Sequence, residues 1–281
     1  MSDSLTKART PLACSVRDCG LPLERRDRAF VCPAGHSFDI ARSGYINLLQ
    51  PQDRRSTHAG DSRAAVEARV ALEQADIGRA VIDGVIEKIV ALDLPADAVV
   101  VDLGSGSGEM LASLSNRRAL CGIGIDLSAA AIEFAARRFP ALTWVVANAD
   151  RRLPLQDESV DVVLSIHGRR NPAEAARVLK AAGAVFVVLP APDDLIELRT
   201  LVQGQGVERD RVEAVIDEHQ PFFNVVERGT VRDMRELEHD ALLNLLQSTY
   251  RGARLASAAR ISALERTPVT FSSHIVVFRR R

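Results

Sequence analysis

The 281-residue sequence predicts an α/β fold with a mostly parallel sheet, preceded by a small cysteine-rich module. Three observations predict it. Short apolar segments alternate with helical ones through the middle of the chain, a glycine-rich turn follows the first of these apolar segments, and three of the four cysteines lie within the first 32 residues. Strands that alternate with helices favour a parallel sheet with right-handed crossovers.

Composition narrows the class of protein. Apolar residues make up 47% of the chain and charged residues 26%, which is enough for a sizeable core. The formal net charge of −1 argues against a protein that is basic all over. Because no apolar run approaches the roughly 20 residues of a membrane span and no signal-peptide core is evident, we expect a cytoplasmic protein without a membrane partner.

The first 50 residues contain a candidate metal site. Cys14 and Cys19 form one pair of potential ligands, and Cys32 and His36 form another. Such pairs can close a tetrahedral Cys3His zinc site, which leaves no open position and is therefore structural. A module of about 40 residues has too little core to fold unaided, so a metal makes physical sense. The alternative is three buried thiols and an unrelated histidine.

The domain layout follows from composition and periodicity. We expect a disordered tail, a zinc-binding head, a polar linker and a catalytic domain at residues 1–11, 12–50, 51–62 and 63–281. Two leading helices within 63–93 should cover an edge of the sheet. Strands are expected at 98–103, 120–125, 142–147, 160–166 and 183–189, and helices at 108–116, 128–138, 171–180 and 193–202.

The C-terminal part departs from this alternation. A helix near 209–218 is followed by an apolar segment at 222–228, a helix near 236–248 and a terminal strand at 269–278. Two strands without a long crossover after the second suit an antiparallel hairpin that closes the sheet edge.

The glycine-rich turn is the main candidate for a ligand site. Glycines at Gly104, Gly106 and Gly108 follow an apolar strand and open a helix, so backbone can approach a ligand closely there. Their G-x-G-x-G spacing differs from the G-x-G-x-x-G of dinucleotide folds, which disfavours an NAD-dependent oxidoreductase. Asp126 ends the second strand, where an acid can bind both ribose hydroxyls. Its alternative role is an N-cap, which Ser128 can provide itself.

These features resemble the class I S-adenosylmethionine-dependent methyltransferases. Asp102–Gly108 is similar to their glycine-rich motif, Asp126 to their ribose acid, and Asn148-Ala149-Asp150 to their adenine-edge loop. The resemblance implies a Rossmann-like sheet with an antiparallel C-terminal strand, and S-adenosylmethionine as cofactor. It implies contacts from Asp102, Gly104, Ser105, Gly106, Ser107, Gly108, Asp126, Asn148, Ala149, Asp150 and Asp194. Relatives often have a histidine near the cofactor where this chain reads Pro190-Ala-Pro-Asp-Asp194.

The head narrows the resemblance. Cys32–Leu49 is similar to the zinc-ribbon-like head of the RlmA-type 23S rRNA guanine-N1 methyltransferases, and Gly60-Asp61-Ser62 with Ala68-Arg69 resembles the start of their catalytic domain. The resemblance implies methyl transfer to N1 of a guanosine in 23S rRNA and a head that helps grip an RNA hairpin. It leaves a homodimer open.

The chemistry indicates one candidate catalytic residue. Guanine N1 lies on the Watson–Crick edge, so the base must be in a loop or flipped out. His167 leaves the fourth strand at its carboxyl end, where it can accept the N1 proton. The alternative is a hydrogen-bonded loop histidine.

Arginines are concentrated near the head. Residues 1–60 carry nine Lys/Arg against six Asp/Glu, a formal charge of +3. As a group they can contact phosphates, although any one of them is more often a solvated surface charge. The candidates are Arg25, Arg26, Arg28, Arg42, Arg54, Arg55, Arg169 and Arg170.

Two other functions stay open. One is a methyltransferase of a small molecule or protein, whose zinc head only supports folding, and the near-neutral charge favours it. The other is a catalytically inactive RNA-binding relative. The departures from the RlmA pattern at Ala75–Gly78 and around Asp194 are the features that bear on this second alternative.

Overall fold

The computed structural model describes residues 10–51, 60–203, 209–248 and 266–281. The predicted tail therefore lies almost wholly outside the described residues, as do most of the linker, Arg54 and Arg55. Pro11 is buried and its carbonyl accepts a hydrogen bond from Gln156, so the folded head begins before residue 12.

Eleven strands and eight helices make up the described chain. The strands are β1 (Glu24–Arg26), β2 (Ala29–Val31), β3 (Ser37–Asp39), β4 (Ile46–Asn47), β5 (Val99–Leu103), β6 (Cys121–Asp126), β7 (Thr143–Val146), β8 (Val160–Ile166), β9 (Leu179–Pro190), β10 (Phe223–Glu238) and β11 (Arg266–Arg280). The helices are α1 (Arg63–Gln74), α2 (Arg79–Val90), α3 (Glu109–Ser115), α4 (Ala129–Arg138), α5 (Pro172–Val178), α6 (Ile196–Gln203), α7 (Val212–His219) and α8 (His239–Ser248).

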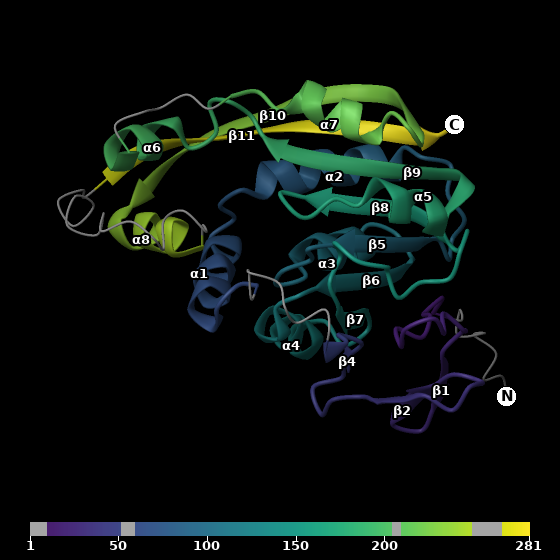
Figure 1. Cartoon of the computed structure of the whole chain (residues 1–281). Coiled ribbons are helices and arrows are strands. Elements are labelled where there is room, and N and C mark those ends of the chain that lie inside the picture. The colour runs from purple at the N-terminus through teal and green to yellow at the C-terminus, as the bar shows by residue number, and fades with distance from the viewer. Residues whose placement is uncertain (1–9, 52–59, 204–208, 249–265) are drawn as a thin grey trace, which may run out of the picture.

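Eight of the strands form one sheet in the order β10-β11-β9-β8-β5-β6-β7-β4 (Figure 1). Strands β4 to β9 are parallel to their neighbours, whereas β11 is antiparallel to β9 and β10 to β11. This arrangement confirms the predicted fold class. It also aligns the carboxyl ends of β5 to β9 along one edge of the sheet, where ligands bind in open α/β folds.

Apolar side chains cover both faces of the sheet. On one face, α5, α7 and the head pack against alternate residues such as Val101, Ile123 and Val163. On the other face, α2, α3 and α4 cover residues such as Val100, Val162 and Phe186. Burial on both faces explains the nearly continuous apolar strands that the sequence displays.

The leading helices differ from the prediction. Helix α2 packs against β10 and β11, but α1 packs against α8 and α4 rather than along a sheet edge. In Figure 1, α1 and α8 lie at the end of the sheet to which the parallel strands point. The first leading helix therefore borders the ligand side of the fold.

The C-terminal hairpin is longer than predicted. The expected strand at 222–228 continues to Glu238, and β10 pairs with β11 along nearly its whole length. The far half of the hairpin extends past the sheet and carries α8. There Leu237, Leu242 and Phe271 form a separate apolar cluster with Leu72 of α1 and Leu198 of α6.

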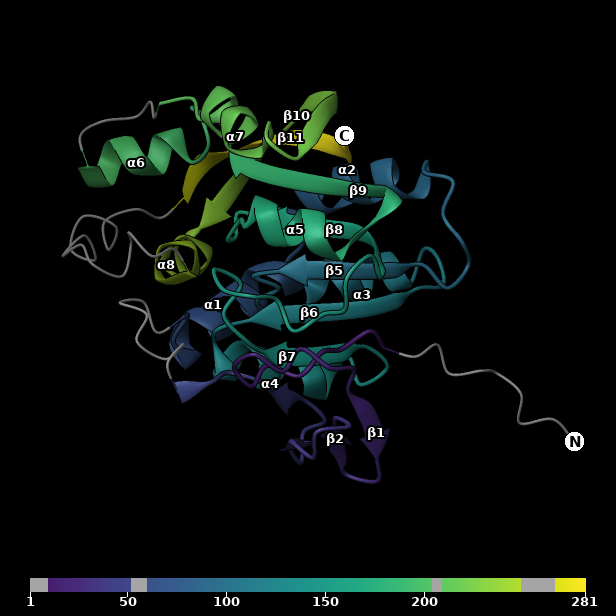
Figure 2. The same ribbon diagram turned by 45° about the vertical axis from the view of Figure 1, so that its right-hand side comes forward.

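The head has its own three-stranded antiparallel sheet, β1-β2-β3, and then joins the catalytic sheet (Figure 2). Strand β4 adds to the edge strand β7 in parallel, and Leu48 N–H donates to the carbonyl of Val146. This pairing was not predicted, because a two-residue strand leaves no periodicity in the sequence.

Candidate functional site

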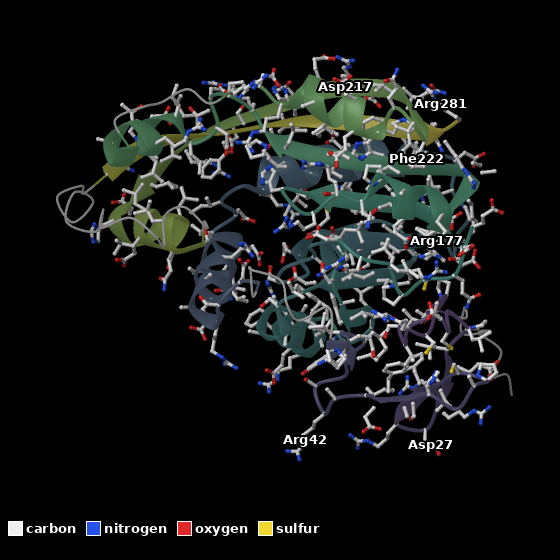
Figure 3. All side chains as sticks on the ribbon, in the orientation of Figure 1. Asp27, Arg42, Arg177, Asp217, Phe222 and Arg281 are labelled. Carbon is white, nitrogen blue, oxygen red and sulfur yellow. The ribbon has the colours of Figure 1, made fainter. Side chains whose placement is uncertain are left out.

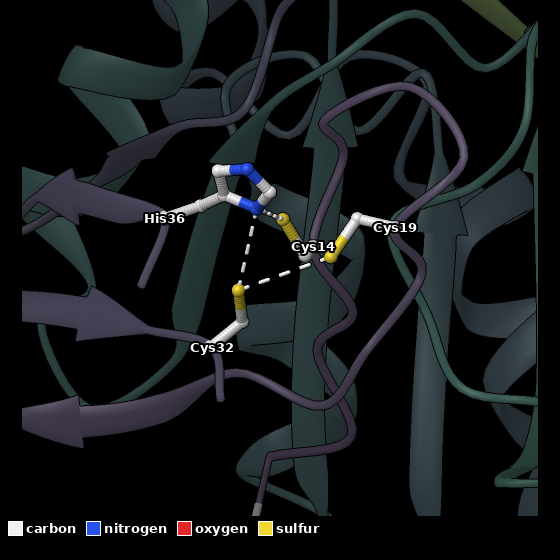
Figure 4. Close-up of side chains that lie close together, drawn as sticks. All are labelled: Cys14, Cys19, Cys32 and His36. Atoms are coloured by element: carbon white, nitrogen blue, oxygen red, sulfur yellow. Dashed lines mark hydrogen bonds between the residues drawn. The ribbon is translucent and has the colours of Figure 1, made fainter. Parts of the chain in front are cut away.

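The four predicted metal ligands lie together in the head (Figure 4). Their ligand atoms are all within 4.8 Å of one another. His36 Nδ1 lies 3.4 Å from both Cys14 Sγ and Cys32 Sγ, and Cys19 Sγ lies 3.9 Å from Cys32 Sγ. A tetrahedral zinc ion with ordinary bond lengths spaces sulfur pairs about 3.8 Å apart and sulfur–nitrogen pairs about 3.5 Å apart. The donor set and its spacing fit structural zinc.

Two tight turns bring these ligands together. In the first, Cys19 N–H donates to the Val16 carbonyl; in the second, Cys32 and His36 are closed by a hydrogen bond from Cys32 N–H to the His36 carbonyl. Burial raises the pKa of the Cys14 thiol to about 12. The thiolate that zinc requires therefore depends on the charge of the metal itself.

The glycine-rich turn lies between β5 and α3. Gly104, Gly106 and Gly108 have φ values of +80°, +53° and +87°, in the left-handed region that favours glycine. Gly104 and Ser105 donate to the Ile125 carbonyl, which ties the turn to the end of β6. Because glycine has no side chain, a ligand can approach the backbone of this loop closely.

Asp126 is attached to this turn. Its Oδ2 accepts the Gly106 N–H at 3.0 Å and its Oδ1 accepts the Ser128 N–H at 2.7 Å. The Ser128 hydroxyl caps α4 by accepting from Ala131, so the helix does not need Asp126 as its N-cap. Burial raises the pKa of Asp126 despite these two hydrogen bonds. A half-buried carboxylate with remaining acceptor capacity suits ribose hydroxyls.

The surroundings of Asp102 indicate what kind of ligand fits this site. Among the described residues, Asp102 Oδ1 and Ser105 Oγ are buried without hydrogen-bond partners. Burial, with the neighbouring charge of Asp126, raises the pKa of Asp102 to about 7. A buried acid and a half-buried acid near the ends of adjacent strands favour a ligand that carries positive charge, as the sulfonium cofactor does. The residues present therefore fit this cofactor.

The adenine-edge loop follows β7. Asn148 Oδ1 accepts the Asp150 N–H at 3.0 Å, and Asn171 donates to the Ala149 carbonyl at 3.2 Å. Asp150 is exposed and lies 3.6 Å from Arg169, which belongs to the loop after β8. The loops after β7 and β8 thus face each other across the carboxyl end of β5.

His167 begins the loop after β8. Its Nε2 lies 2.9 Å from the hydroxyl of the buried Ser273, and its φ of +50° is left-handed. The residue as a whole is exposed, whereas its hydrogen-bonded ring is partly buried. Burial of the ring, together with the charge of Arg69, lowers the pKa of His167 to about 4. The imidazole is therefore neutral near pH 7.

Asp194 is positioned differently from the other predicted cofactor residues. Its Oδ1 accepts the N–H of Ser272 at 2.9 Å, just beyond the end of β9. Nearby, Glu197 accepts both the N–H and the hydroxyl of Thr270. The two carboxylates accept hydrogen bonds from β11 in the part of that strand that no longer pairs with β9. Asp194 therefore has a structural role. A cofactor contact by Asp194 stays a prediction.

Sequence reasoning missed the polar side chains that α1 contributes to the site. The Ser107 hydroxyl donates to Glu73, whose second carboxylate oxygen lies 3.2 Å from Arg138 of α4. Arg69 pairs with Asp61 beside Gly106. Arg69 and Glu73 stand four residues apart, and this spacing, which places both on one helix face, was the available signal.

The predicted basic residues are spread over two surfaces. Arg25, Arg26, Arg28 and Arg42 are exposed on the head, and Figure 3 shows Arg42 pointing away from the catalytic sheet. Arg170 instead pairs with Glu218 at 3.2 Å. No helix in the described ranges is long and apolar enough to cross a bilayer.

Two family models match separate parts of the chain. A family model described as "RlmA, N-terminal" matches residues 12–57, and one described as "Methyltransferase domain" matches residues 100–186. Among solved structures, a chain in the complex between the Trm112 methyltransferase activator of Haloferax volcanii and a methyltransferase aligns with a TM-score of 0.52. It is 16% identical and the alignment covers 77% of this chain and 96% of that one, which supports the fold alone.

Two relatives match much more of the sequence. A protein of Micromonospora griseorubida that bears the name of a 23S rRNA (guanine-N1)-methyltransferase is 34% identical, over 96% of this chain and 97% of its own. The 23S rRNA (guanine(748)-N(1))-methyltransferase of Streptomyces fradiae is 34% identical over 80% of each chain. The chain therefore belongs to the family of 23S rRNA (guanine-N1)-methyltransferases.

Proposed function

We propose that this protein transfers a methyl group from S-adenosylmethionine to N1 of a guanosine in 23S rRNA. The single observation that carries the proposal is the 34% identity that extends over both the head and the catalytic part of named relatives. Similarity of the catalytic fold alone would fit many substrates. The RlmA-type head, joined to a glycine-rich cofactor site, favours RNA over a small molecule.

The site residues divide the work of binding. S-adenosylmethionine supplies a methyl group activated by a sulfonium. We assign the ribose to Asp126 and the adenine edge to Asn148, Ala149 and Asp150, with the turn from Asp102 to Gly108 beneath the rest of the cofactor. Positioning of this kind can supply much of the rate of a methyl transfer.

His167 suits hydrogen bonding better than proton abstraction. Its neutral ring can face a guanine edge from the carboxyl end of β8. A pKa of about 4, however, makes it a weak acceptor for the N1 proton at neutral pH, because a general base works best with a pKa near the working pH. We therefore propose that His167 orients the base through Nδ1, while Nε2 is held by the Ser273 hydroxyl.

We assign the RNA contact to the head at residues 12–50 and to its exposed arginines. The expected target is a hairpin whose loop presents the guanine, since a paired base hides N1. We expect the protein to work in the cytoplasm, where reducing conditions keep its cysteines from forming disulfides. A homodimer remains open.

A labelling experiment tests the function. The protein is incubated with labelled S-adenosylmethionine and 23S rRNA that lacks its own N1-methylguanosine, and the modified nucleosides are mapped. Label at guanosine N1 supports the proposal. Cofactor binding without label on RNA favours another substrate, and RNA binding without cofactor binding indicates an inactive relative.

A further inference from the structure

Arg69 lies directly over the glycine-rich turn. A Cβ built on Gly106 would lie only 3.3 Å from Arg69 Nη1. The same nitrogen pairs with Asp61 Oδ2 at 2.5 Å, and Nη2 donates to the Ser248 carbonyl at the end of α8 at 3.1 Å. About a third of the Arg69 side chain is exposed, so a ligand on the turn can reach the guanidinium.

The guanidinium of Arg69 also acts on two titratable groups of the site. Its charge partly offsets the rise that burial causes in the pKa of Asp126, at the end of β6, and adds to the lowering of the pKa of His167, at the end of β8. These two residues flank the turn on opposite sides, because β5 lies between β6 and β8 in the sheet. Arg69 therefore sits above the middle of the site.

The proposed cofactor orientation determines which end Arg69 meets. Asp126 and the loop at 148–150 direct the ribose and adenine toward β6 and β7. The methionine end must then extend the other way, over Gly106 and toward β8. Its only anionic group is the α-carboxylate, and its α-ammonium lies one carbon away.

The Arg69–Asp61 pair matches those two groups. A guanidinium fork recognises a carboxylate, and an adjacent aspartate accepts from an ammonium. Asp61 is firmly placed, because its carbonyl accepts the Ser128 hydroxyl at 2.7 Å. Gly60 packs so tightly beside Ser128 that a Cβ there would lie 2.8 Å from the Ser128 nitrogen.

We propose that Arg69 and Asp61 together bind the amino-acid group of S-adenosylmethionine, with Arg69 on the carboxylate and Asp61 on the ammonium. This inference rests on the proposed function, since it takes the cofactor and its direction from there. The competing explanation is a purely structural ion pair that ties the segment at residues 60–61 to α1.

Two ligands separate the explanations. S-adenosylhomocysteine carries the amino-acid group, and 5′-methylthioadenosine lacks it but keeps the adenosine. Calorimetry on the full chain should show that Arg69→Met weakens S-adenosylhomocysteine binding by about 10- to 100-fold, the worth of one charge-assisted pair. Binding of 5′-methylthioadenosine should not change. Asp61→Asn should give a smaller loss that is selective in the same way.

Controls keep the result interpretable. Arg63→Met removes an exposed arginine from the first turn of the same helix and should change neither affinity. If Arg69→Met fails to fold, Arg69→Lys and a comparison of S-adenosylhomocysteine with its decarboxylated analogue on the wild type measure the same contribution. Weaker binding of the decarboxylated analogue supports the inference.

Three results would overturn the inference. Equal losses for both ligands would indicate a structural pair, and no loss would remove Arg69 from the site. In either case, intact S-adenosylhomocysteine binding by the wild type leaves the proposed function standing. If the wild type binds neither ligand, the proposed function fails as well.

Discussion

Leu12 of the head and Leu155 of the catalytic domain form an antiparallel bridge, and both side chains are completely buried. Flanking hydrogen bonds join Ala13 N–H to the Pro154 carbonyl and Gln156 N–H to the Pro11 carbonyl, each at 2.9 Å. Cys14 and Cys32 belong to the same apolar cluster as this bridge and the face of β5 to β8. The metal cluster and the catalytic sheet thus share one core.

Removing zinc should therefore destabilise more than the head. We expect near-stoichiometric zinc in purified protein, and we expect Cys32→Ser to lower the melting temperature of the whole chain by about 5–10 °C, because metal binding contributes directly to folding. Metal analysis and calorimetry check this. Cys121→Ser, outside the cluster, should retain the zinc. Folded wild-type protein without zinc would contradict the prediction.

A side chain on the glycine-rich turn should weaken cofactor binding. Gly106→Ala forces alanine into a left-handed backbone conformation, with its methyl group against the Arg69 guanidinium. The free variant can relax out of this strained conformation, and restoring it on binding costs about 1–3 kcal/mol, so we expect at least about a fivefold loss of S-adenosylhomocysteine affinity by calorimetry. Gly229→Ala is the matched control, because its Cβ would meet only the flexible end of Lys88. Equal affinities for the two variants would argue against a ligand on this turn.

The raised pKa of Asp102 should appear in the pH dependence of stability. Between pH 3.8, its ordinary pKa, and about 7, the folded protein keeps a proton that the unfolded chain has released. The Asp102 contribution therefore lowers the free energy of unfolding as pH rises through this interval, by up to about 1.4 kcal/mol per pH unit. In urea unfolding, the free energy of unfolding of Asp102→Asn should rise relative to that of the wild type from about pH 5 to about pH 8. Asp217→Asn, on the exposed face of α7, is the control and should show no such rise (Figure 3). If the difference in free energy of unfolding between the variant and the wild type does not change with pH, the pKa of Asp102 is not raised.

The head arginines should control RNA affinity through salt. Arg25, Arg26 and Arg28 are exposed around the β1–β2 turn. Replacing all three with Gln should reduce the slope of log affinity against log salt by about 2 to 3, because each phosphate contact contributes about 0.7 to 0.9 to the slope. Filter binding to the 23S rRNA fragment measures the slope. Arg228→Gln with Arg281→Gln, at the other end of the molecule, is the control, and an equal effect there would indicate only nonspecific charge.

Much of the fold was predictable because buried parallel strands have a distinctive sequence. Val99–Leu103 and Val160–Ile166 are nearly all apolar. The glycine-rich turn after the first of these strands indicated at which edge of the sheet a ligand binds. The second half of β10 was missed because residues such as Arg232, Arg235 and Glu236 are charged and exposed, and only backbone pairing with β11 makes that segment a strand.

The site was predictable where ligands come from adjacent sequence. Two short cysteine and histidine pairs indicated the metal cluster, and Ser128 was expected to be the cap that it is. Arg69 and Glu73 were missed because their role depends on where α1 packs, and contacts with α8 across about 170 residues of chain decide that. The hydrogen bond of Asp194 to β11 was likewise invisible before the hairpin was placed.

The proposed role of His167 is to orient the substrate base. If its neutral ring orients guanine, His167→Ala should lower kcat on RNA by about 10- to 100-fold while leaving S-adenosylhomocysteine affinity unchanged, and His167→Asn should recover part of the loss because an amide retains a donor and an acceptor. The pKa of about 4 predicts that the wild-type kcat shows no histidine-dependent step between pH 5 and 8. Single-turnover methylation across this range measures both effects. Ser273→Ala, which removes the partner of Nε2 but not the ring, should give a smaller loss than His167→Ala. Unchanged turnover of His167→Ala on the correct RNA would remove this residue from the mechanism, and a step near pH 6.5 would instead restore it as a proton acceptor.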